Sequence, residues 1–528
     1  MENLKDDPFT WSPDLAFPLV FSTLNAADII TNVDTTNIYM VDDDNFVTLI
    51  YRNVVFSKTI NDLFKIPNAI PFLDSRSLSG TEVSDFNNNG SVSAPFNGDH
   101  GFDLDTTAAT AQLEFVEFYD GSTMEVALLG DFLAEGSVTV SYPELTLSGV
   151  PLSHTFNFDN TTGQGISQSA SKDIAGYRLV LSAPTPNNLE MNYQFNLTTG
   201  SVDASNSIQA ISVLNNARIG LTVGDFGQIN LEIAPDVVDI DILDNQQEGN
   251  LNFIDPRLKV TMKNSFGMSM QGTINQLRAI GDGAQFIDVD YTSVTGSPFI
   301  IDGGTNPGDT NTVEWYFTGT QNVTPGSNSN IDLVMNANYQ DLVYDLDAST
   351  NPAGGSPNPN WATANSALEV TADIELPFWG TASNFTIRDT IDFPIGDADE
   401  FRDNIIEALL RVNTLNGFPV DGALILHFTD SLYNITASVL NNGELLVRSG
   451  TIDANGRVVS QTNENNDIIL DTQKINAVFG AKYIILDAIM NSTNGGQTAI
   501  RLYDDYELQV NLGFQVKLSA SPSDLDGL

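Results

Sequence analysis

Residues 85–90, Asp-Phe-Asn-Asn-Asn-Gly, are the best-defined candidate for a site of chemistry in the sequence. Carboxylate or amide oxygens stand at positions 1, 3 and 5 of this segment and glycine stands at position 6, as a calcium-binding loop requires. The twelfth position is Phe96 instead of a bidentate glutamate, so a turn-forming polar loop is the alternative interpretation. Acidic residues downstream could supply the missing oxygens. The candidate calcium ligands, which share an oxygen donor within one polar stretch, are Asp85, Asn87, Asn89, Asp99, Asp103 and Asp105.

Other catalytic and metal-binding patterns are missing from the sequence. The histidines His100, His154 and His427 lie far apart, so a metal site built on them would need a convergence that no spacing indicates. No Gly-x-Ser-x-Gly turn, phosphate-binding glycine loop or dinucleotide fingerprint occurs. Carboxylates are so abundant that a glycosidase pair cannot be chosen without geometry. We therefore predict a protein that is not an enzyme and that holds no cofactor, with calcium as the one ion to consider.

Tryptophan offers the remaining route to a binding surface. Trp361 sits in the proline- and glycine-rich residues 349–366, where it would serve as a stacking platform for sugar or as an anchor for a partner. Packing in a core or between domains is the alternative. An extended segment near the N-terminus would pack its aromatic residues on a partner or on the first domain. The candidate partner-binding residues are Phe9, Trp11 and Trp361.

Charge and cysteine content narrow the possible partners and sites. The 528 residues carry 68 acidic and 21 basic side chains, and the resulting formal charge of −47 repels phosphate backbones, which argues against nucleic-acid binding. Such acidity favours solubility or, alternatively, the binding of divalent cations. Cysteine is absent, so disulfides, thiolate metal sites and cysteine nucleophiles do not contribute. No apolar run approaches the roughly 18 to 20 residues that span a bilayer.

Alternating apolar and polar residues dominate the chain. The predicted fold class is therefore all-β, with several β-sandwich-like domains and a few short crossover helices. Turn residues predict two hairpins, one around residues 42–45 and one around Asp120-Gly121. Short helices are expected after Ser57, over residues 397–410 from Asp397, and between Asp471 and Gly480.

Turn-rich stretches place the predicted domain boundaries. The clearest stretch is residues 349–366, and a second one ends at Asn250. The resulting prediction is an extended N-terminal tether over residues 1–24, a β domain with a long polar loop over 25–134, a β-sandwich over 135–248, a β-sandwich over 249–365 that ends in the Pro/Gly-rich linker, and a C-terminal β-sandwich over 366–528.

One pattern occurs twice, in residues 257–274 and again in residues 409–426. In each copy alternating apolar residues lead to an Asn-centred turn and then to an aromatic residue that re-enters the core, which are Asn264 and Phe266 in one copy and Asn416 and Phe418 in the other. We interpret each copy as a hairpin of fixed register, because a one-residue slip would turn its apolar face to solvent. The spacing of the copies is typical of a domain, so they predict two related β-sandwich modules.

Three stretches together resemble the large surface lipoproteins of Bacteroidota. They are ENLKDDPFTWSPDLAFPLV from Glu2, NTLNGFPVDGALILHF from Asn413 and RLYDDYELQVNLGFQVKL from Arg501. The resemblance implies export to the outer membrane and the cell surface, with a lipidated cysteine ahead of Glu2, at the position of Met1. It also implies that an acidic stretch behind that cysteine, here Glu2, Asp6 and Asp7, marks the protein for the outer face.

The expected function follows from this resemblance. It is that of a non-enzymatic accessory or structural subunit of an outer-membrane complex for barrel assembly, secretion or uptake, with an outer-membrane barrel protein as partner. The alternative is a surface glycan-binding protein or adhesin, with calcium as a stabilising ion. Exposed coplanar aromatic residues on a flat sheet would favour that alternative, whereas a large apolar patch would favour the subunit. An enzyme would need a cleft with two carboxylates about 5 to 10 Å apart.

Overall fold

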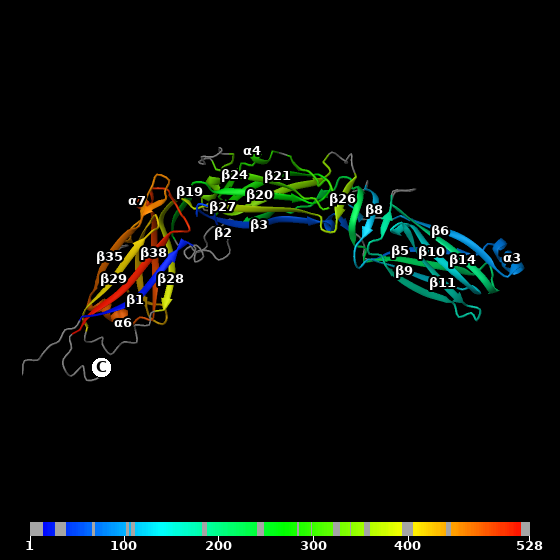
Figure 1. Ribbon diagram of the computed structural model, residues 1–528, viewed down its shortest axis with the longest axis horizontal. Helices are drawn as coiled ribbons and strands as arrows, with labels where there is room; N and C mark the ends of the chain where they lie inside the picture. The colour runs from blue at the N-terminus through cyan, green and yellow to red at the C-terminus, as the bar shows by residue number, and fades with distance from the viewer. Residues whose placement is uncertain are drawn as a thin grey trace, which may run out of the picture.

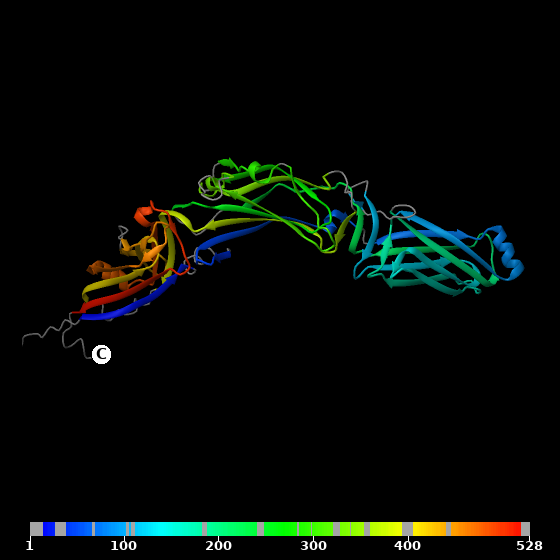
Figure 2. The ribbon, with the colours of Figure 1, turned by 45° about the horizontal axis from the view of Figure 1, so that its top comes forward.

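The computed structural model describes residues 14–26, 38–65, 69–101, 105–106, 111–181, 187–239, 248–281, 285–296, 298–319, 328–337, 339–352, 359–392, 405–439 and 445–518. These residues form an all-β fold, as predicted, in which antiparallel sheets pack in pairs as three β-sandwiches. Figures 1 and 2 show the sandwiches end to end in a bent rod. We name them the proximal sandwich, which holds β1 (Asp14–Asn25) and β38 (Glu507–Leu518), the middle sandwich, and the distal sandwich, which holds helix α3 (Gly80–Asn89).

The described strands of the proximal sandwich form two sheets. One has the order β1, β38, β29 (Ile405–Asn416), β35 (Thr462–Leu470). The other has the order β19 (Glu248–Phe253), β28 (Trp379–Asp392), β36 (Tyr483–Ser492), β30 (Val420–Thr429), β31 (Ile435–Val439), with β32 (Leu445–Val447) on β30 and β37 (Ile500–Arg501) on β28. Helices α6 (Thr472–Phe479) and α7 (Thr493–Gly496) and the pair β33 (Thr451–Ile452) and β34 (Val458–Ser460) complete it.

The middle sandwich is built in the same way from its described strands. Its first sheet has the order β2 (Ile38–Val41), β3 (Val47–Thr59), β27 (Ala367–Pro377), β20 (Arg257–Asn264), β24 (Asn311–Thr318). Its second sheet has the order β17 (Asn230–Leu231), β25 (Tyr339–Thr350), β21 (Met270–Gly281), β22 (Phe286–Asp288), with β18 (Asp236–Asp239) on β25 and β23 (Phe299–Ile301) on β21. The short helices α4 (Thr292–Thr295) and α5 (Ile331–Met335) connect its strands.

The distal sandwich also consists of a larger and a smaller sheet. The larger has the order β26 (Asn360–Thr363), β16 (Ile219–Asp225), β8 (Gln112–Phe118), β13 (Arg178–Val180), β10 (Leu133–Leu147), β14 (Asn188–Ser201), β6 (Val92–Gly101), with β11 (Val150–Asp159) on β10. The smaller has the order β12 (Ile166–Asp173), β9 (Thr123–Gly130), β15 (Ser207–Asn215), β5 (Ala69–Ser77). Helix α2 (Ile60–Leu63) and the pair β4 (Phe64–Lys65) and β7 (Asp105–Thr106) lie at its start.

The chain visits the three sandwiches in a nested order, beginning and ending in the proximal one. After β1 in the proximal sandwich, the chain forms β2 and β3 of the middle one and β4 to β16 of the distal one. It returns through β17 and β18 to β19, and then forms β20 to β25 of the middle sandwich. Of the described strands that follow, β26 joins the distal sandwich again, β27 returns to the middle one, and β28 to β38 complete the proximal one. Each sandwich therefore combines segments that are far apart in the sequence.

This path differs from the consecutive domains that the sequence predicts. Residues 14–24 of the predicted tether belong to β1, which pairs with β38 from Asp14 opposite Lys517 to Asn25 opposite Glu507. Residues 360–363 of the predicted linker form β26 and pair with β16. Alternation identifies a strand and its buried face, but it does not identify the partner strand, and for that reason the predicted boundaries follow chain order.

The hydrophobic cores continue across both junctions between sandwiches. The cluster that fills the distal sandwich includes Phe266 and Met268 of the middle one. The cluster that fills the middle sandwich includes Phe418, Tyr503 and Tyr506 of the proximal one. Because buried apolar side chains connect each pair of neighbours, we expect the rod to hold its bend instead of hinging freely.

The first copy of the repeated pattern is a corner between the two sheets of the middle sandwich. Asn264 is fully buried where β20 ends, and its amide nitrogen donates to the carbonyl oxygens of Met268 at 2.9 Å and Asp302 at 3.2 Å. Its side-chain oxygen accepts from the backbone N–H of Phe266 at 3.1 Å. The chain then continues into β21, which belongs to the opposite sheet.

The second copy repeats this corner in the proximal sandwich. The buried Asn416 donates to the carbonyl oxygens of Val420 at 3.0 Å and Arg448 at 2.9 Å, and it accepts from the N–H of Phe418 at 2.8 Å. β29 and β30 lie in opposite sheets, just as β20 and β21 do. The predicted hairpins are therefore wrong. Each copy is instead a sheet-to-sheet corner that a buried asparagine holds, and the two sandwiches share it.

Of the other predicted elements, the hairpin around residues 42–45 is confirmed. Val41 pairs with Val47, and the Asp42 carboxylate accepts the backbone N–H groups of Asp44 and Phe46 at 2.9 and 2.8 Å. The hairpin at Asp120-Gly121 is wrong, because β8 and β9 lie in opposite sheets of the distal sandwich.

The predicted helices have mixed outcomes. Helix α2 follows Ser57 as predicted, and α6 begins after Asp471, whose side chain accepts the N–H of Lys474 at 2.8 Å. Asp397 lies outside the described residues, and the end of the helix predicted there is wrong, because Ile405 begins β29. Burial against both neighbouring strands outweighs local helix propensity at that segment.

Candidate functional site

The predicted calcium loop lies instead at the end of helix α3. Ser79 and Glu82 form a capping box at the start of this helix, and Gly90 ends it in the left-handed region with φ 73°. Successive helical residues turn by about 100°, so Asn87 points away from the side that Asp85 and Asn89 share. A loop that wraps its oxygens around one ion is therefore not formed. The Ser-x-x-Glu pattern and the glycine were the sequence signals that would have predicted the helix.

The remaining candidate calcium ligands do not converge on this helix. Asp99 lies on β6 and accepts a hydrogen bond from the side chain of Asn188 on β14. Asp103 lies outside the described residues, and of Asp105 only the backbone is described, as part of β7. Within the described part of the chain, no three His, Asp or Glu side chains are grouped closely enough to hold a metal ion.

Trp361 is an internal packing residue. Only 5 % of it is exposed, and its indole N–H donates to the carbonyl oxygen of Gly304 at 3.2 Å. A Cβ atom at Gly267 would collide with the indole ring, so the ring lies flat against that backbone. Residues of the middle sandwich thus cover the indole face of Trp361 at the junction with the distal sandwich. The ring cannot serve as a platform for sugar or a partner. Phe9 and Trp11 lie outside the described residues.

His100 and His427 join polar contacts that sequence spacing did not predict, because their partners are remote in the sequence. His100 Nε2 lies 2.9 Å from Asp74 Oδ2, and the hydroxyl of Tyr193 donates to the same oxygen at 2.7 Å. Burial raises the pKa of Tyr193, and the Asp74 carboxylate raises it further. This contact lies between the sheets of the distal sandwich. Burial also lowers the pKa of His154, which favours its neutral form.

His427 connects two neighbouring strands of the proximal sandwich. Its Nδ1 lies 2.7 Å from Ser438 Oγ, and its Nε2 lies 3.3 Å from Asp487 Oδ2. The residue types are those of a serine protease triad. In a triad, however, the serine contacts Nε2 and the aspartate contacts Nδ1, whereas here the serine contacts Nδ1 and the aspartate contacts Nε2. Since β31, β30 and β36 are adjacent in one sheet, we interpret the contact as a cross-strand link that stabilises the sheet.

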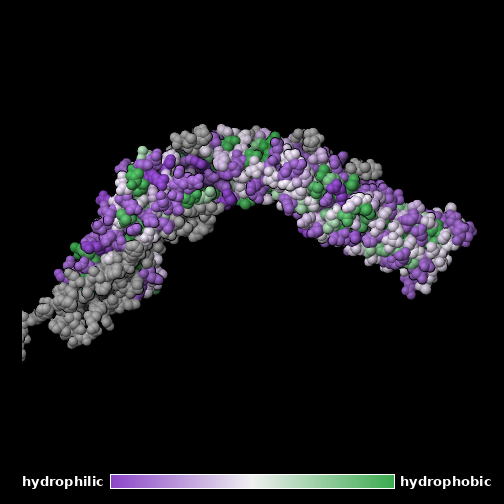
Figure 3. Space-filling model, viewed as in Figure 1, coloured by the Kyte–Doolittle hydropathy of each residue, from purple (hydrophilic) through white to green (hydrophobic). Residues whose placement is uncertain are grey.

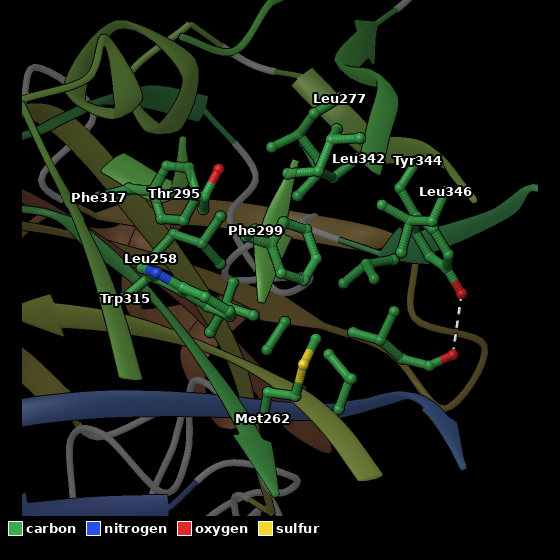
Figure 4. Close-up of a pocket in the computed structure, with 16 residues that line it drawn as sticks. Leu258, Met262, Leu277, Thr295, Phe299, Trp315, Phe317, Leu342, Tyr344 and Leu346 are labelled. Atoms are coloured by element: carbon green, nitrogen blue, oxygen red, sulfur yellow. Dashed lines mark hydrogen bonds between the residues drawn. The ribbon is translucent and has the colours of Figure 1, made fainter. Parts of the chain in front are cut away.

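An apolar pocket of about 70 Å³ lies between the two sheets of the middle sandwich (Figure 4). Both sheets and the α4–β23 segment contribute to its wall. The lining residues labelled in Figure 4 are Leu258, Met262, Leu277, Thr295, Phe299, Trp315, Phe317, Leu342, Tyr344 and Leu346. The polar end of Tyr344 is occupied, because its hydroxyl donates to the carbonyl oxygen of Val55 at 2.9 Å. So apolar a lining suits an apolar group, because a water molecule there would find few hydrogen-bond partners.

Small side chains on one sheet explain the pocket. Val260 and Ala372 lie opposite each other on β20 and β27, and Val370 precedes them in the next row. Sheets in a sandwich lie about 10 Å apart, so short side chains on one face leave space below the larger residues on the other. The volume suits a group of a few carbon atoms and is too small for a whole lipid, given that a cavity of about 150 Å³ holds benzene.

We expect the substitution Ala372→Leu to stabilise the middle sandwich by about 1 to 2 kcal/mol, since a cavity costs about 24 cal/mol per Å³ and this pocket measures about 70 Å³. Denaturant unfolding monitored by tryptophan fluorescence would measure the change. The control Ala408→Leu adds the same atoms at a fully buried position of the proximal core and should cost about 1 to 3 kcal/mol through overpacking. A loss of stability from Ala372→Leu comparable to that of the control would show that the space is not available to a side chain.

The turn between β30 and β31 exposes a group of apolar side chains. Leu432 is 77 % exposed, Tyr433 54 % and Ile435 57 %, and we name these three residues the apolar turn. The face of the molecule shown in Figure 3 is mostly hydrophilic, with small separate hydrophobic patches. Three large apolar residues within four positions are therefore a local concentration, of the kind that marks an interaction site.

The backbone of the apolar turn is held in a strained conformation. Tyr433 has φ 62°, which an aromatic residue adopts only when its surroundings impose it. The Asp430 carboxylate accepts the N–H groups of Leu432 and Asn434 and the Asn434 side chain at 2.8, 2.9 and 3.0 Å. The hydrogen bonds from Asn434 and then Leu432 lower the pKa of Asp430. The ring of Tyr433 also stacks on the ring of Tyr483, with 4.6 Å between the ring centroids. The exposed side chains are thus presented on a fixed framework.

Comparisons with known proteins leave the family open. No family model matches the chain, and no curated protein matches it in sequence. Among solved structures, the chain is similar to a protein described as secreted from Parabacteroides distasonis, at 12% identity and a TM-score of 0.29, over 57% of this chain and 90% of that one. It is also similar to a structure of infectious bursal disease virus, at 8% identity and a TM-score of 0.13, over 89% and 84% of the two chains.

A third similarity is to PNGase F, a glycosylasparaginase from Flavobacterium meningosepticum. It has 13% identity and a TM-score of 0.12, over 55% of this chain and 96% of that one. At TM-scores this low, none of these likenesses establishes a shared activity. In the described residues, no helix combines the length and the apolar character that crossing a bilayer requires.

Proposed function

We propose that this protein is a non-enzymatic, exported surface protein that acts as an accessory subunit of an outer-membrane complex, with a barrel protein as its partner. The apolar turn is the observation that supports this proposal. Large apolar side chains on a fixed backbone lose little conformational entropy on binding. Buried aromatic anchors such as Tyr supply much of the binding energy at protein interfaces.

The position of the apolar turn agrees with a partner in the membrane. Thr429, which precedes the turn, pairs with Tyr483, where β36 begins after α6. Figure 1 places α6 at the outer end of the proximal sandwich, and β1 begins at the same end. An N-terminal lipid anchor, which the resemblance to Bacteroidota lipoproteins implies, would hold this end of the rod at the membrane. The apolar turn would then face a membrane-embedded partner.

The proposal is tested by photo-crosslinking in intact envelopes. A photoreactive amino acid at position 432 should capture one outer-membrane barrel protein, whereas the same amino acid at position 459 should not. Val459 is a suitable control because it is 65 % exposed on the same sandwich but lies outside the apolar turn. Crosslinks at both positions to the same set of proteins, or none at position 432, would contradict docking through this turn.

A variant without the apolar side chains complements the crosslinking. The substitutions Leu432→Ser, Tyr433→Asn and Ile435→Thr should lower recovery of the barrel partner at least tenfold after affinity isolation from detergent, since interface anchors contribute about 2 kcal/mol or more each. Asparagine tolerates the left-handed conformation of residue 433, so the fold is retained. The matched variant Val459→Ser should recover the partner in near-equal amount. Equal recovery by both variants would reject the proposal.

A further inference from the structure

An outer face of the distal sandwich carries a regular array of uncharged side chains, all of them polar except that of Pro95. It covers β6, β14, β10 and β11, which pair in this order, and the inward residues between the array positions fill the core. The array consists of three rows in register across the four strands: Asn97, Asn192, Ser141 and Ser153; Pro95, Gln194, Thr139 and Thr155; Ser93, Asn196, Ser137 and Asn157. We name these twelve residues the polar plate.

Charge is absent from the polar plate but present at its ends. Beyond one end, Asp99 on β6 pairs with Glu190 on β14. Beyond the other end, Glu135 on β10 pairs with Asp159 on β11. With strands about 4.8 Å apart and rows about 6.8 Å apart, the plate measures about 14 by 14 Å. A neutral area of this size therefore lies between acidic borders in a protein of net charge −47.

Hydrogen bonds between neighbouring strands hold part of the plate in place. The Ser93 hydroxyl donates to Asn196 Oδ1 at 2.6 Å, and Gln194 Nε2 donates to Ser93 Oγ at 2.8 Å. The hydroxyls of Thr139 and Thr155 lie 2.9 Å apart. Side chains that are already ordered lose less entropy when they bind a ligand. Amide and hydroxyl groups also keep further donor and acceptor capacity after one bond.

We propose that the polar plate binds a neutral glycan. The hydroxyl groups of a sugar both donate and accept hydrogen bonds, as the amides and hydroxyls of the plate do, so the two surfaces can be complementary without any charge. An anionic glycan or a nucleic acid would be repelled by the acidic borders and by the net charge. Recognition here rests on hydrogen bonds, because the plate contains no aromatic ring on which a sugar could stack.

Protein partners fit the plate less well. Interface cores are enriched in aromatic residues, Met and Arg and depleted in Ser, which is the opposite of this composition. A second copy of the chain is disfavoured as well, because two molecules of charge −47 repel each other. The proposal does not depend on the function of the apolar turn, which lies on the proximal sandwich.

Affinity electrophoresis in gels that contain one neutral polysaccharide each, such as mannan, dextran or xyloglucan, tests the proposal, with anionic alginate as the comparison. At least one neutral polysaccharide should retard the full-length protein, and alginate should not. The substitutions Gln194→Glu and Asn196→Asp keep the shape of the plate and add charge, so they should weaken the retardation at least tenfold. Thr155→Lys, on the exposed strand β11, should do the same without altering β14.

The control Asn465→Asp makes the same chemical change at an exposed position of β35, on the proximal sandwich, and should leave retardation unchanged. Thermal melting would establish that each variant is folded. Three results would overturn the proposal: no retardation by any neutral polysaccharide, retardation that folded plate variants retain in full, or retardation by alginate alone. Dimerisation that the plate variants abolish, without glycan binding, would assign the surface to self-association instead and would also overturn it.

Discussion

Deletion of residues 1–26 should unfold the proximal sandwich while the middle and distal sandwiches keep their thermal transitions. β1 is the edge strand of its sheet, and it pairs with β38 along nearly its whole length, from Asp14 opposite Lys517 to Asn25 opposite Glu507. At about 0.5 to 1.5 kcal/mol per backbone hydrogen bond, the loss of this ladder is comparable to the stability of a typical domain, about 5 to 15 kcal/mol. Ala26, which is fully buried, would be lost as well.

Differential scanning calorimetry and limited proteolysis would measure this effect, with cleavage expected first within residues 405–518. Rescue provides the control: residues 14–26 attached behind residue 528 through a flexible linker should restore the transition, because β38 ends where β1 begins. The same linker with a scrambled segment should not. An unchanged calorimetric profile after the deletion would mean that this segment is the tether predicted from the sequence and contributes nothing to the sandwich.

The substitution Asn416→Ala should destabilise the proximal sandwich by about 3 kcal/mol, because it removes three hydrogen bonds of about 1 kcal/mol each and leaves buried partners unpaired. Asn264→Ala should cost the middle sandwich a similar amount, since its side chain makes the same three contacts. Asn416→Asp should cost more than Ala at neutral pH. A carboxylate still accepts from Phe418, but it cannot donate to Val420 or Arg448.

Urea unfolding, followed separately for the two sandwiches, would test the corner asparagines. Asn413→Ala is the matched control, since Asn413 lies three residues earlier on β29 and is only half-buried, and it should change stability by less than about 0.5 kcal/mol. If Asn416→Ala behaved like this control, the buried asparagine would not hold the corner. If Asn264→Ala changed stability as little as the control while Asn416→Ala was strongly destabilising, the two corners would share their geometry but not their contribution to stability.

Local features of the fold were predictable from the sequence. Alternation identified strands such as β14, in which Leu189, Met191 and Tyr193 are buried between half-buried polar residues. The Asp42 turn and the Asp471 cap depend on neighbours within a few positions, which is why both are confirmed. Repetition of the Asn-x-Phe pattern correctly indicated a shared structural unit, although its form was misjudged.

Long-range features were not predictable from those signals. A turn looks alike whether the next strand pairs with the last one or crosses to the opposite sheet, and the turns after Asn264, Asn416 and Asp120 all cross. The energy that decides this comes from burial of both faces, which involves strands far away in the sequence. The pairing of β1 with β38 is the extreme case.

The candidate sites also depend on long-range structure that local sequence patterns do not reveal. Asp85 and its neighbours match a calcium loop position by position, yet the capping box at Ser79 places them on a helix. Trp361 was the most suggestive aromatic residue, and it is buried against Gly267. The apolar turn depends on side-chain exposure and on the backbone angle of Tyr433, and the polar plate depends on strand register, so neither could be found before the strands were paired.

Nesting of the sandwiches implies an order of assembly during synthesis. β26 arrives only after residue 359, so the distal sandwich is complete before β27 completes the middle one. β1 leaves the ribosome before the other described strands but must wait for β38, nearly 500 residues later, before its partner exists. The molecule would thus mature from its far tip towards its starting strand, and an interrupted chain would expose β1 as an unpaired edge, open to aggregation and to proteases that clear incomplete products.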